Sequence, residues 1–193
     1  MLSYLAAALP EDTSAAARLL ALQCALRMNT HMRVHLSKGV LRSLRLDTAE
    51  SPWHELEHAR WLRTAPGGAA NEIIAELLDL TLLGQAPARP DRRRSADWAL
   101  RAGSSSAVRA IGPLRQLASV YLAAHADPES GTGLGDLGQM ARACGIQPAE
   151  LASTLDQLAR TGLLESWQAC PDSGDLRWTL ARGTGIRVDD HGR

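Results

Sequence analysis

The segment His54-Glu55-Leu56-Glu57-His58 has the residue types and the spacing of a zinc-peptidase motif. Two histidines four residues apart lie on one face of a helix, where both can bind zinc, and the adjacent glutamate can act as a general base. Pro52 stands just before the motif, and no clear downstream helix offers a third ligand, since Glu72 and Glu76 are the only near candidates. A zinc peptidase is therefore the least favoured of three hypotheses. We assign no catalytic residue, no metal and no cofactor.

Two other patterns are interpreted as structural. The glycines of Gly131-Thr-Gly-Leu-Gly135 fit neither the dinucleotide fingerprint nor the P-loop, and no apolar strand precedes them, so we predict a loop. His31 and His35 are also four residues apart, but apolar residues alternate over 32–36 as in a strand. An extended strand would hold the two rings too far apart for one metal ion.

Positive charge is concentrated near the start of a chain whose formal net charge is zero. No acidic residue lies between Asp12 and Asp47, and a second basic cluster follows at residues 92–94. The six Lys and Arg side chains of the first stretch are Arg18, Arg27, Arg33, Lys38, Arg42 and Arg45. If this half of the chain binds DNA, we expect Arg33, Lys38, Arg42 and Arg45 to contact phosphates. The alternative is an ordinary solvated helix face.

The second half of the sequence predicts helices followed by a β-hairpin. Gly145 can take the left-handed conformation that ends a helix, and Pro148 fits the first turn of the next one. Turn residues at 171–174 separate two apolar, alternating segments. The predicted elements are helices over Val108–Ala124, over Leu137–Ala143 and from Gln147-Pro148 to Thr161-Gly162, and strands over Leu163–Ala169 and Asp175–Leu180.

This order of elements resembles the winged helix-turn-helix superfamily. The resemblance covers residues 108–182, with its motif in LGQMARACGIQPAEL at 137–151 and LDQLARTGLL at 155–164. Winged helices usually place the third helix in the major groove of DNA and touch phosphates with the wing and the start of the second helix. The residues that this implies for DNA binding are Gln147, Ser153, Thr154, Gln157 and Arg160 on the third helix and Arg177 on the wing.

Acidic residues on the same third helix favour a different partner. Glu150 and Asp156 would repel phosphate, and from Val108 onward the chain carries eight Lys or Arg against ten Asp or Glu. The second hypothesis is therefore a winged-helix module that binds another protein and not DNA.

The first half repeats the plan less clearly. Ser37 is expected to cap its second helix, and Pro52 lies in the opening turns of the third. Glu72–Leu80 is predicted as the second strand of a hairpin turned at Ala65–Gly68, although its apolar spacing fits a helix nearly as well. The other predicted elements are helices over Ala15–Met28, Ser37–Leu44 and Thr48–Trp61 and a strand over Met32–Leu36.

The predicted fold is mainly α with small β wings, as two winged helix-turn-helix units in tandem. Arg outnumbers Lys 20 to 1, and the chain as a whole resembles tandem winged-helix transcriptional regulators of GC-rich bacteria. The predicted divisions are an N-terminal winged-helix-like domain over 1–84, a connector with a short helix capped by Ser95 over 85–107, a C-terminal winged helix-turn-helix domain over 108–182 and a flexible tail over 183–193.

The first hypothesis is thus a transcriptional regulator that binds double-stranded DNA as a homodimer. The helix Ser95–Arg101 and the long helix from Val108 are the expected dimer interface. Met1–Pro10 lacks the basic residues of a secretory signal, and no apolar run approaches the ~18 residues that span a bilayer, so we expect no membrane and a cytoplasmic protein. The widely separated Cys24, Cys144 and Cys170 are expected to be buried thiols.

Overall fold

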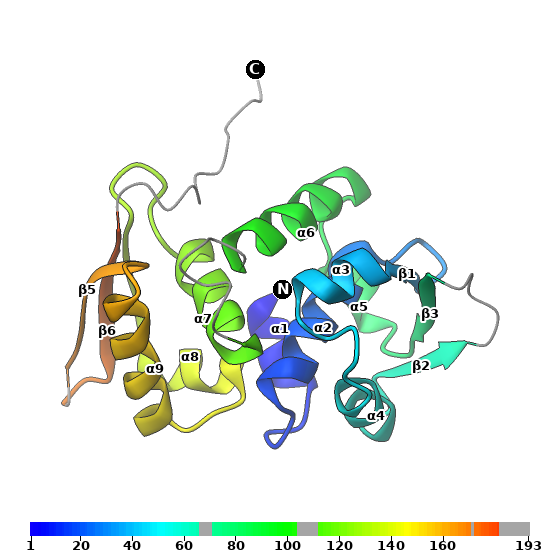
Figure 1. The fold of residues 1–193 in the computed structure, drawn as a ribbon, viewed down its shortest axis with the longest axis horizontal. Coiled ribbons are helices and arrows are strands. Elements are labelled where there is room, and N and C mark those ends of the chain that lie inside the picture. The colour runs from blue at the N-terminus through cyan, green and yellow to red at the C-terminus, as the bar shows by residue number, and fades with distance from the viewer. Residues whose placement is uncertain (66–70, 104–111, 171, 182–193) are drawn as a thin grey trace.

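The computed structural model describes residues 1–65, 71–103, 112–170 and 172–181. Over these residues the fold contains helices and two three-stranded antiparallel sheets. Figure 1 shows the sheets at opposite ends of the long axis of the molecule, with helices between them. Of the predicted features, the turn at 66–68, the helix start at 108–111 and the tail at 183–193 lie outside the described residues.

The first sheet belongs to the N-terminal half of the chain. Its elements are α2 (Ala15–Arg27), β1 (Arg33–Ser37), α3 (Lys38–Ser43), α4 (Ser51–His58), β2 (Leu62–Ala65) and β3 (Glu72–Leu77). β3 lies in the middle of the sheet, in the order β1-β3-β2, with Val34 opposite Ala75 and Thr64 opposite the same residue. The apolar spacing of Glu72–Leu80 fits either a strand or a helix, and the structure forms strand β3 over most of this segment.

The C-terminal half has the same order of elements. They are α7 (Pro113–Ala124), β4 (Thr132–Asp136), α8 (Leu137–Cys144), α9 (Pro148–Arg160), β5 (Leu164–Ala169) and β6 (Asp175–Leu180). The last strand again lies in the middle, in the order β4-β6-β5. Each half therefore runs helix, strand, helix, helix, strand, strand, with its strands in the same spatial order.

Short-range sequence signals account for several helix ends. Ser37 accepts a hydrogen bond from the Val40 N–H at the start of α3, as predicted. Gly145 follows α8 with φ +69°, the left-handed conformation expected of it, and Pro148 occupies the first turn of α9. These residues set where α3 begins, where α8 ends and where α9 begins without help from distant parts of the chain.

The predicted loop at Gly131–Gly135 is wrong, because most of it is strand β4. β4 pairs with β6 from Thr132 opposite Thr179 to Asp136 opposite Asp175. A Cβ atom on Gly133 would lie 2.1 Å from ring atoms of Trp178, so glycine is required where the indole ring covers the strand. The ring nitrogen of Trp178 donates to the Leu122 carbonyl at 3.2 Å, which fixes the ring against α7.

Three further helices lie outside the repeated plan, and all of them correct the sequence analysis. They are α1 (Leu2–Ala8), α5 (Thr81–Gln85) and α6 (Arg89–Gly103). α1 and α5 are absent from the predicted elements. α6 begins six residues before Ser95, so Ser95 lies inside it and is not a cap, and most of the predicted connector is helical. No helix of the described ranges has the length and apolar character needed to cross a bilayer.

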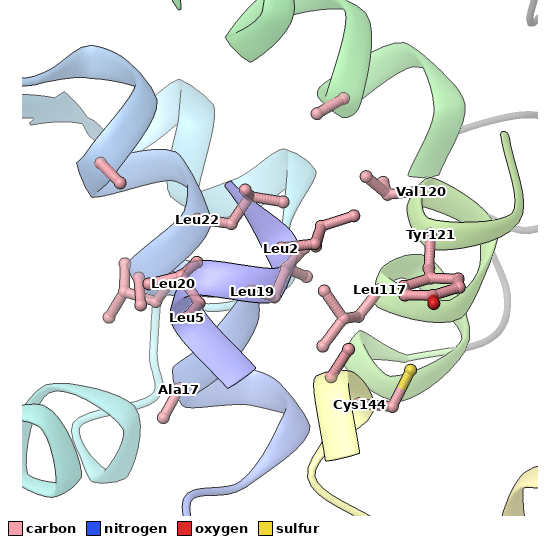
Figure 2. Close-up of a cluster of buried hydrophobic side chains, with 14 of the residues drawn as sticks. Leu2, Leu5, Ala17, Leu19, Leu20, Leu22, Leu117, Val120, Tyr121 and Cys144 are labelled. Carbon is pink, nitrogen blue, oxygen red and sulfur yellow. The ribbon is translucent and has the colours of Figure 1, made fainter. Parts of the chain in front are cut away.

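The core is continuous between the two halves. Figure 2 shows Leu2 of α1 and Leu22 of α2 on one side and Leu117, Val120 and Tyr121 of α7 on the other. α6 packs against both α2 and α7, and α1 packs against α8. Each fully buried leucine stabilises the fold by about 2 kcal/mol relative to an exposed one, so this contact holds the halves together.

The cysteines differ from the prediction at one position. Cys24 and Cys144 are buried, as expected, but Cys170 is exposed. Burial raises the pKa of the Cys24 thiol, and it raises the pKa of Cys144 to about 12. Hydrogen bonds from the Ser173 side chain and from backbone N–H groups lower the pKa of Cys170. Only the last thiol is therefore both accessible and easily ionised.

We expect one cysteine per native chain to react with a disulfide reagent, and all three to react after unfolding in guanidinium. Because the Cys170 pKa is lowered, its reaction should persist to a lower pH than that of a free cysteine. The absorbance of the thiolate that the reagent releases gives the number of cysteines that have reacted. A Cys170→Ser chain that still reacts in its native state would contradict the burial of the other two thiols.

Candidate nucleic-acid interface

Three of the four basic residues predicted to contact phosphates lie together on α3 and the turn after it. Leu41 points into the core, which leaves Lys38 and Arg42, one turn apart, on the outer face of the helix. Arg45 follows with φ +59° and is also exposed. The cap on α3 and the buried Leu41 therefore place these side chains at one surface. We call Lys38, Arg42 and Arg45 the α3 basic surface.

These charges are not compensated by neighbouring carboxylates. Within the described ranges none of the three forms an ion pair, and the sole side-chain hydrogen bond is from Arg42 Nε to the Lys38 carbonyl, at 3.4 Å. A cation without a local partner can release counterions from a phosphate on binding, whereas an ion-paired one must first give up its partner. The α3 basic surface is therefore suited to an anionic ligand.

Arg33 lies elsewhere, on the outer face of the first sheet. It is opposite Glu76 on β3, and Glu76 binds Arg63 of β2 at 2.7 Å. The hydrogen bond from Arg63 is the main cause that lowers the pKa of Glu76, and the charge of Arg33 adds to it. Five residues of strand, about 16 Å, separate Arg33 from Lys38. Arg33 is thus part of a cross-strand charge row and not of the α3 basic surface.

Two of the other basic residues are committed to the fold. Arg18 is 2% exposed and donates to the carbonyls of Thr13, Pro10 and Leu5, and Arg27 pairs with Asp97 at 2.7 Å. Sequence reasoning missed this role of Arg18. A helix over residues 15–26 has apolar residues on all of its faces, which is the pattern of a fully buried helix. This pattern was the signal that Arg18 is buried.

The cluster at residues 92–94 is likewise partly internal. Arg92 is buried and donates to the carbonyls of Pro87 and Met28, at 2.7 and 3.1 Å. Arg94 pairs with Asp91 at 3.2 Å. The basic surface is therefore smaller than the sequence count suggested.

The histidines of the zinc-peptidase motif are exposed on α4, while Leu56 between them is buried. The general base that this interpretation requires, Glu55, accepts hydrogen bonds from the Ser14 N–H at 2.8 Å and from the hydroxyls of Ser14 and Ser51. It thus joins the start of α4 to the start of α2. No group of three or more His, Cys, Asp or Glu side chains that could hold a metal ion occurs in the described part of the chain.

The third-ligand candidates are also paired. Glu72 lies 3.2 Å from His35 on the neighbouring strand, and Glu76 binds Arg63. Glu57, the other glutamate of the motif, accepts from the Thr64 hydroxyl and N–H, which lowers its pKa. The Nδ1 atom of His54 lies 3.6 Å from the Glu57 carboxylate, and both histidines are exposed. Neither Glu72 nor Glu76 is paired with them, since these two carboxylates bind His35 and Arg63.

The predicted DNA-contacting residues of α9 divide into two groups. Gln147 at the helix start, Ser153 and Arg160 are exposed, and Gln157 is half-buried. Thr154 corrects the prediction, because it is 3% exposed and its hydroxyl donates to the Glu150 carbonyl at 2.9 Å. Thr154 is three residues after Leu151 and four residues before Leu158, so it lies on the same face of α9 as this apolar stripe and is buried with it.

Acidic side chains dominate the surface around α9. Glu150 and Asp156 are both exposed, and Asp156 accepts from the indole N–H of Trp167 at 3.0 Å. Between residues 113 and 181 the chain has four Lys or Arg and eight Asp or Glu. A phosphate backbone brought against this surface would meet net repulsion.

Arg177 extends from the face of the second sheet that lies opposite α9. Its neighbours across the strands are Gln168 and Leu134, whereas the adjacent Leu176 and Trp178 are buried on the other face. An open concavity of about 630 Å³ covers this outer face. The structure therefore does not bring Arg177 together with the α9 residues.

Comparison of the chain with protein-family profiles, with curated proteins and with solved structures finds no match.

Proposed function

We propose that this chain is a tandem winged helix-turn-helix protein that binds duplex DNA and regulates transcription. One observation carries the proposal: both halves run helix, strand, helix, helix, strand, strand, with the last strand in the middle of its sheet. This is the plan expected of a winged helix, in which the two final strands form the wing. α3 and α8 are then the second helices, and α4 and α9 are the third.

The α3 basic surface supports DNA as the partner. Lys38 lies at the start of the second helix of its half, where winged helices touch the phosphate backbone, and Arg42 and Arg45 extend the same surface. These contacts position the protein without reading sequence. Reading would fall to exposed polar side chains of the third helices, which are His54 and His58 on α4 and Gln147, Ser153 and Arg160 on α9. The α9 set would act beside exposed Glu150 and Asp156, which repel phosphate.

Replacing Arg42 and Arg45 together with alanine is expected to weaken binding to every duplex sequence by a similar factor. Loss of two phosphate contacts should also reduce the slope of log K against log salt by about 2. Fluorescence anisotropy with labelled genomic fragments, repeated across salt concentrations, measures both effects.

The matched control removes the same formal charge from arginines that already have carboxylate partners. Arg27 pairs with Asp97 and Arg94 pairs with Asp91, so the double variant Arg27→Ala/Arg94→Ala should leave the salt slope unchanged. If both double variants reduce the salt slope equally, the α3 basic surface is not the phosphate-binding site. Absence of any binding by the unmodified chain would overturn the proposed function.

A second candidate function is favoured by the charge of α9. Exposed Glu150 and Asp156, in a segment (113–181) with twice as many acidic as basic residues, suit a basic protein surface better than a phosphate backbone. A C-terminal half that binds a protein partner is compatible with DNA binding by the N-terminal half. If the duplex titration finds no binding, this interaction module is the remaining candidate.

A further inference from the structure

The first helices of the two halves pack against each other. α2 and α7 occupy the same place in the repeated plan, and they form one of the main contacts between the halves. Every residue from Ala17 to Leu26 of α2 and from Gln116 to Ala123 of α7 is buried. A helix that covers only its own sheet would leave its outer side exposed. Here the other half of the same chain covers that side (Figure 2).

Polar groups also join the halves. The side-chain amide of Gln116, on α7, donates to the Ser43 carbonyl at the end of α3, at 3.2 Å. Gly145 after α8 packs so closely on the N-terminal half that an added Cβ would lie 2.4 Å from the Thr13 carbonyl oxygen. The contact between the halves therefore has the complementarity of a core and not of a loose domain contact.

Little apolar surface remains for a second copy of the chain. In the described ranges the exposed large apolar side chains are Leu78, Leu80, Leu83 and Leu134. Leu78 and Leu80 lie in the turn between β3 and α5, Leu83 lies on α5, and Leu134 lies on the second sheet. Homodimer interfaces are more apolar than the rest of a protein surface, and these few leucines supply little of such an apolar core. Of the helices where a homodimer interface was expected, α7 is buried along most of its length, and α6 buries its apolar face within the chain and exposes a charged face with Arg93, Arg94 and Asp97.

We infer that the two halves form a built-in pair, so that one chain, and not a homodimer, occupies each DNA site. The α2–α7 contact takes the place of the dimer interface that small DNA-binding modules otherwise need. The halves present different chemistry, with the α3 basic surface on one and Glu150 and Asp156 on the other. The bound duplex is therefore non-palindromic. The DNA part of this inference rests on the proposed function, whereas the monomeric state of the chain does not.

The first experiment measures the mass of the free chain by light scattering over a wide range of concentrations. We expect 20.7 kDa throughout. Twice that mass at the concentrations at which the chain binds DNA would overturn the inference. The double variant Leu80→Asp/Leu83→Asp is the control, and its mass should equal that of the unmodified chain. An unmodified dimer that this variant separates would locate a dimer interface at the exposed leucines.

The second experiment selects duplexes from a random pool and weighs the complexes by native mass spectrometry. We expect one chain per duplex and selected sequences without two-fold symmetry. Two chains on a palindrome would overturn the inference and leave DNA binding intact. If no duplex is retained, the proposed function fails together with the DNA part of this inference, while the mass of the free chain still decides whether the halves replace a dimer.

Discussion

Replacing Gly145 with alanine should destabilise the protein by about 3 kcal/mol. Two effects add. Gly145 has φ +69°, where any residue with a Cβ is strained, and that Cβ would lie 2.4 Å from the Thr13 carbonyl oxygen and 2.6 Å from Arg18 Nε. The Thr13 oxygen belongs to the backbone and cannot rotate away, so the halves must separate slightly. Urea unfolding followed by far-UV circular dichroism measures the loss.

Gly162 provides the matched control. It also follows a helix, with φ +74°, but an added Cβ would meet nothing within 4 Å. Gly162→Ala should therefore cost only the conformational strain, about 1 kcal/mol. The difference between the two variants isolates the close contact between the halves. Equal losses would mean that Gly145 does not pack against the N-terminal half in solution.

Replacing Arg18 with alanine should cost about 3 kcal/mol as well, for a different reason. The guanidinium donates to the Thr13 carbonyl at 3.0 Å, to the Pro10 carbonyl at 2.7 Å and to the Leu5 carbonyl at 3.5 Å. Removing it takes the side-chain donor from the carbonyl of buried Thr13 and opens a cavity between α1 and α2, whereas the Leu5 and Pro10 carbonyls keep the backbone N–H donors of Leu9 and Thr13. Burial lowers the pKa of Arg18, so relief of this desolvation offsets part of the loss.

Arg27, on the same helix, is the comparison for Arg18. Its ion pair with Asp97 is partly exposed to solvent, and such pairs contribute less than about 1 kcal/mol. Arg27→Ala should therefore have a small effect in the same urea unfolding measurement. If the two substitutions cost the same, Arg18 is not the internal link between α1 and α2 that its hydrogen bonds indicate.

Elements with short-range signals were predicted correctly. Ser37, Gly145 and Pro148 act on the few residues next to them, through a cap, a left-handed turn and a fixed φ, so their effects can be read from the sequence. The predicted segments for α2, α3, α8, α9 and the final hairpin agree with the structure within a few residues.

The errors have long-range causes. β4 was predicted as a loop because its glycines are explained only by the Trp178 ring, which lies far along the chain. Arg18 was counted as a solvated charge, although the carbonyls that bind it belong to the unpredicted α1 and the residues after it. The same limit applies to the candidate site. The sequence indicated Lys38, Arg42 and Arg45 but could not show that Arg33 lies in a separate charge row or that Thr154 is buried.

α6 belongs to neither repeated half, and this has a consequence for how the chain can be divided. Its buried face, with Ala96, Ala99 and Ala102, is shared between α2 and α7. A fragment that ends before α6, or one that begins after it, would expose apolar surface that the intact chain covers. The protein is therefore modular in the order of its elements but not in its stability. Substitutions on the outer face of each half can change which ligand it binds without disturbing the core. Substitutions on the inner faces must preserve the packing between the two halves.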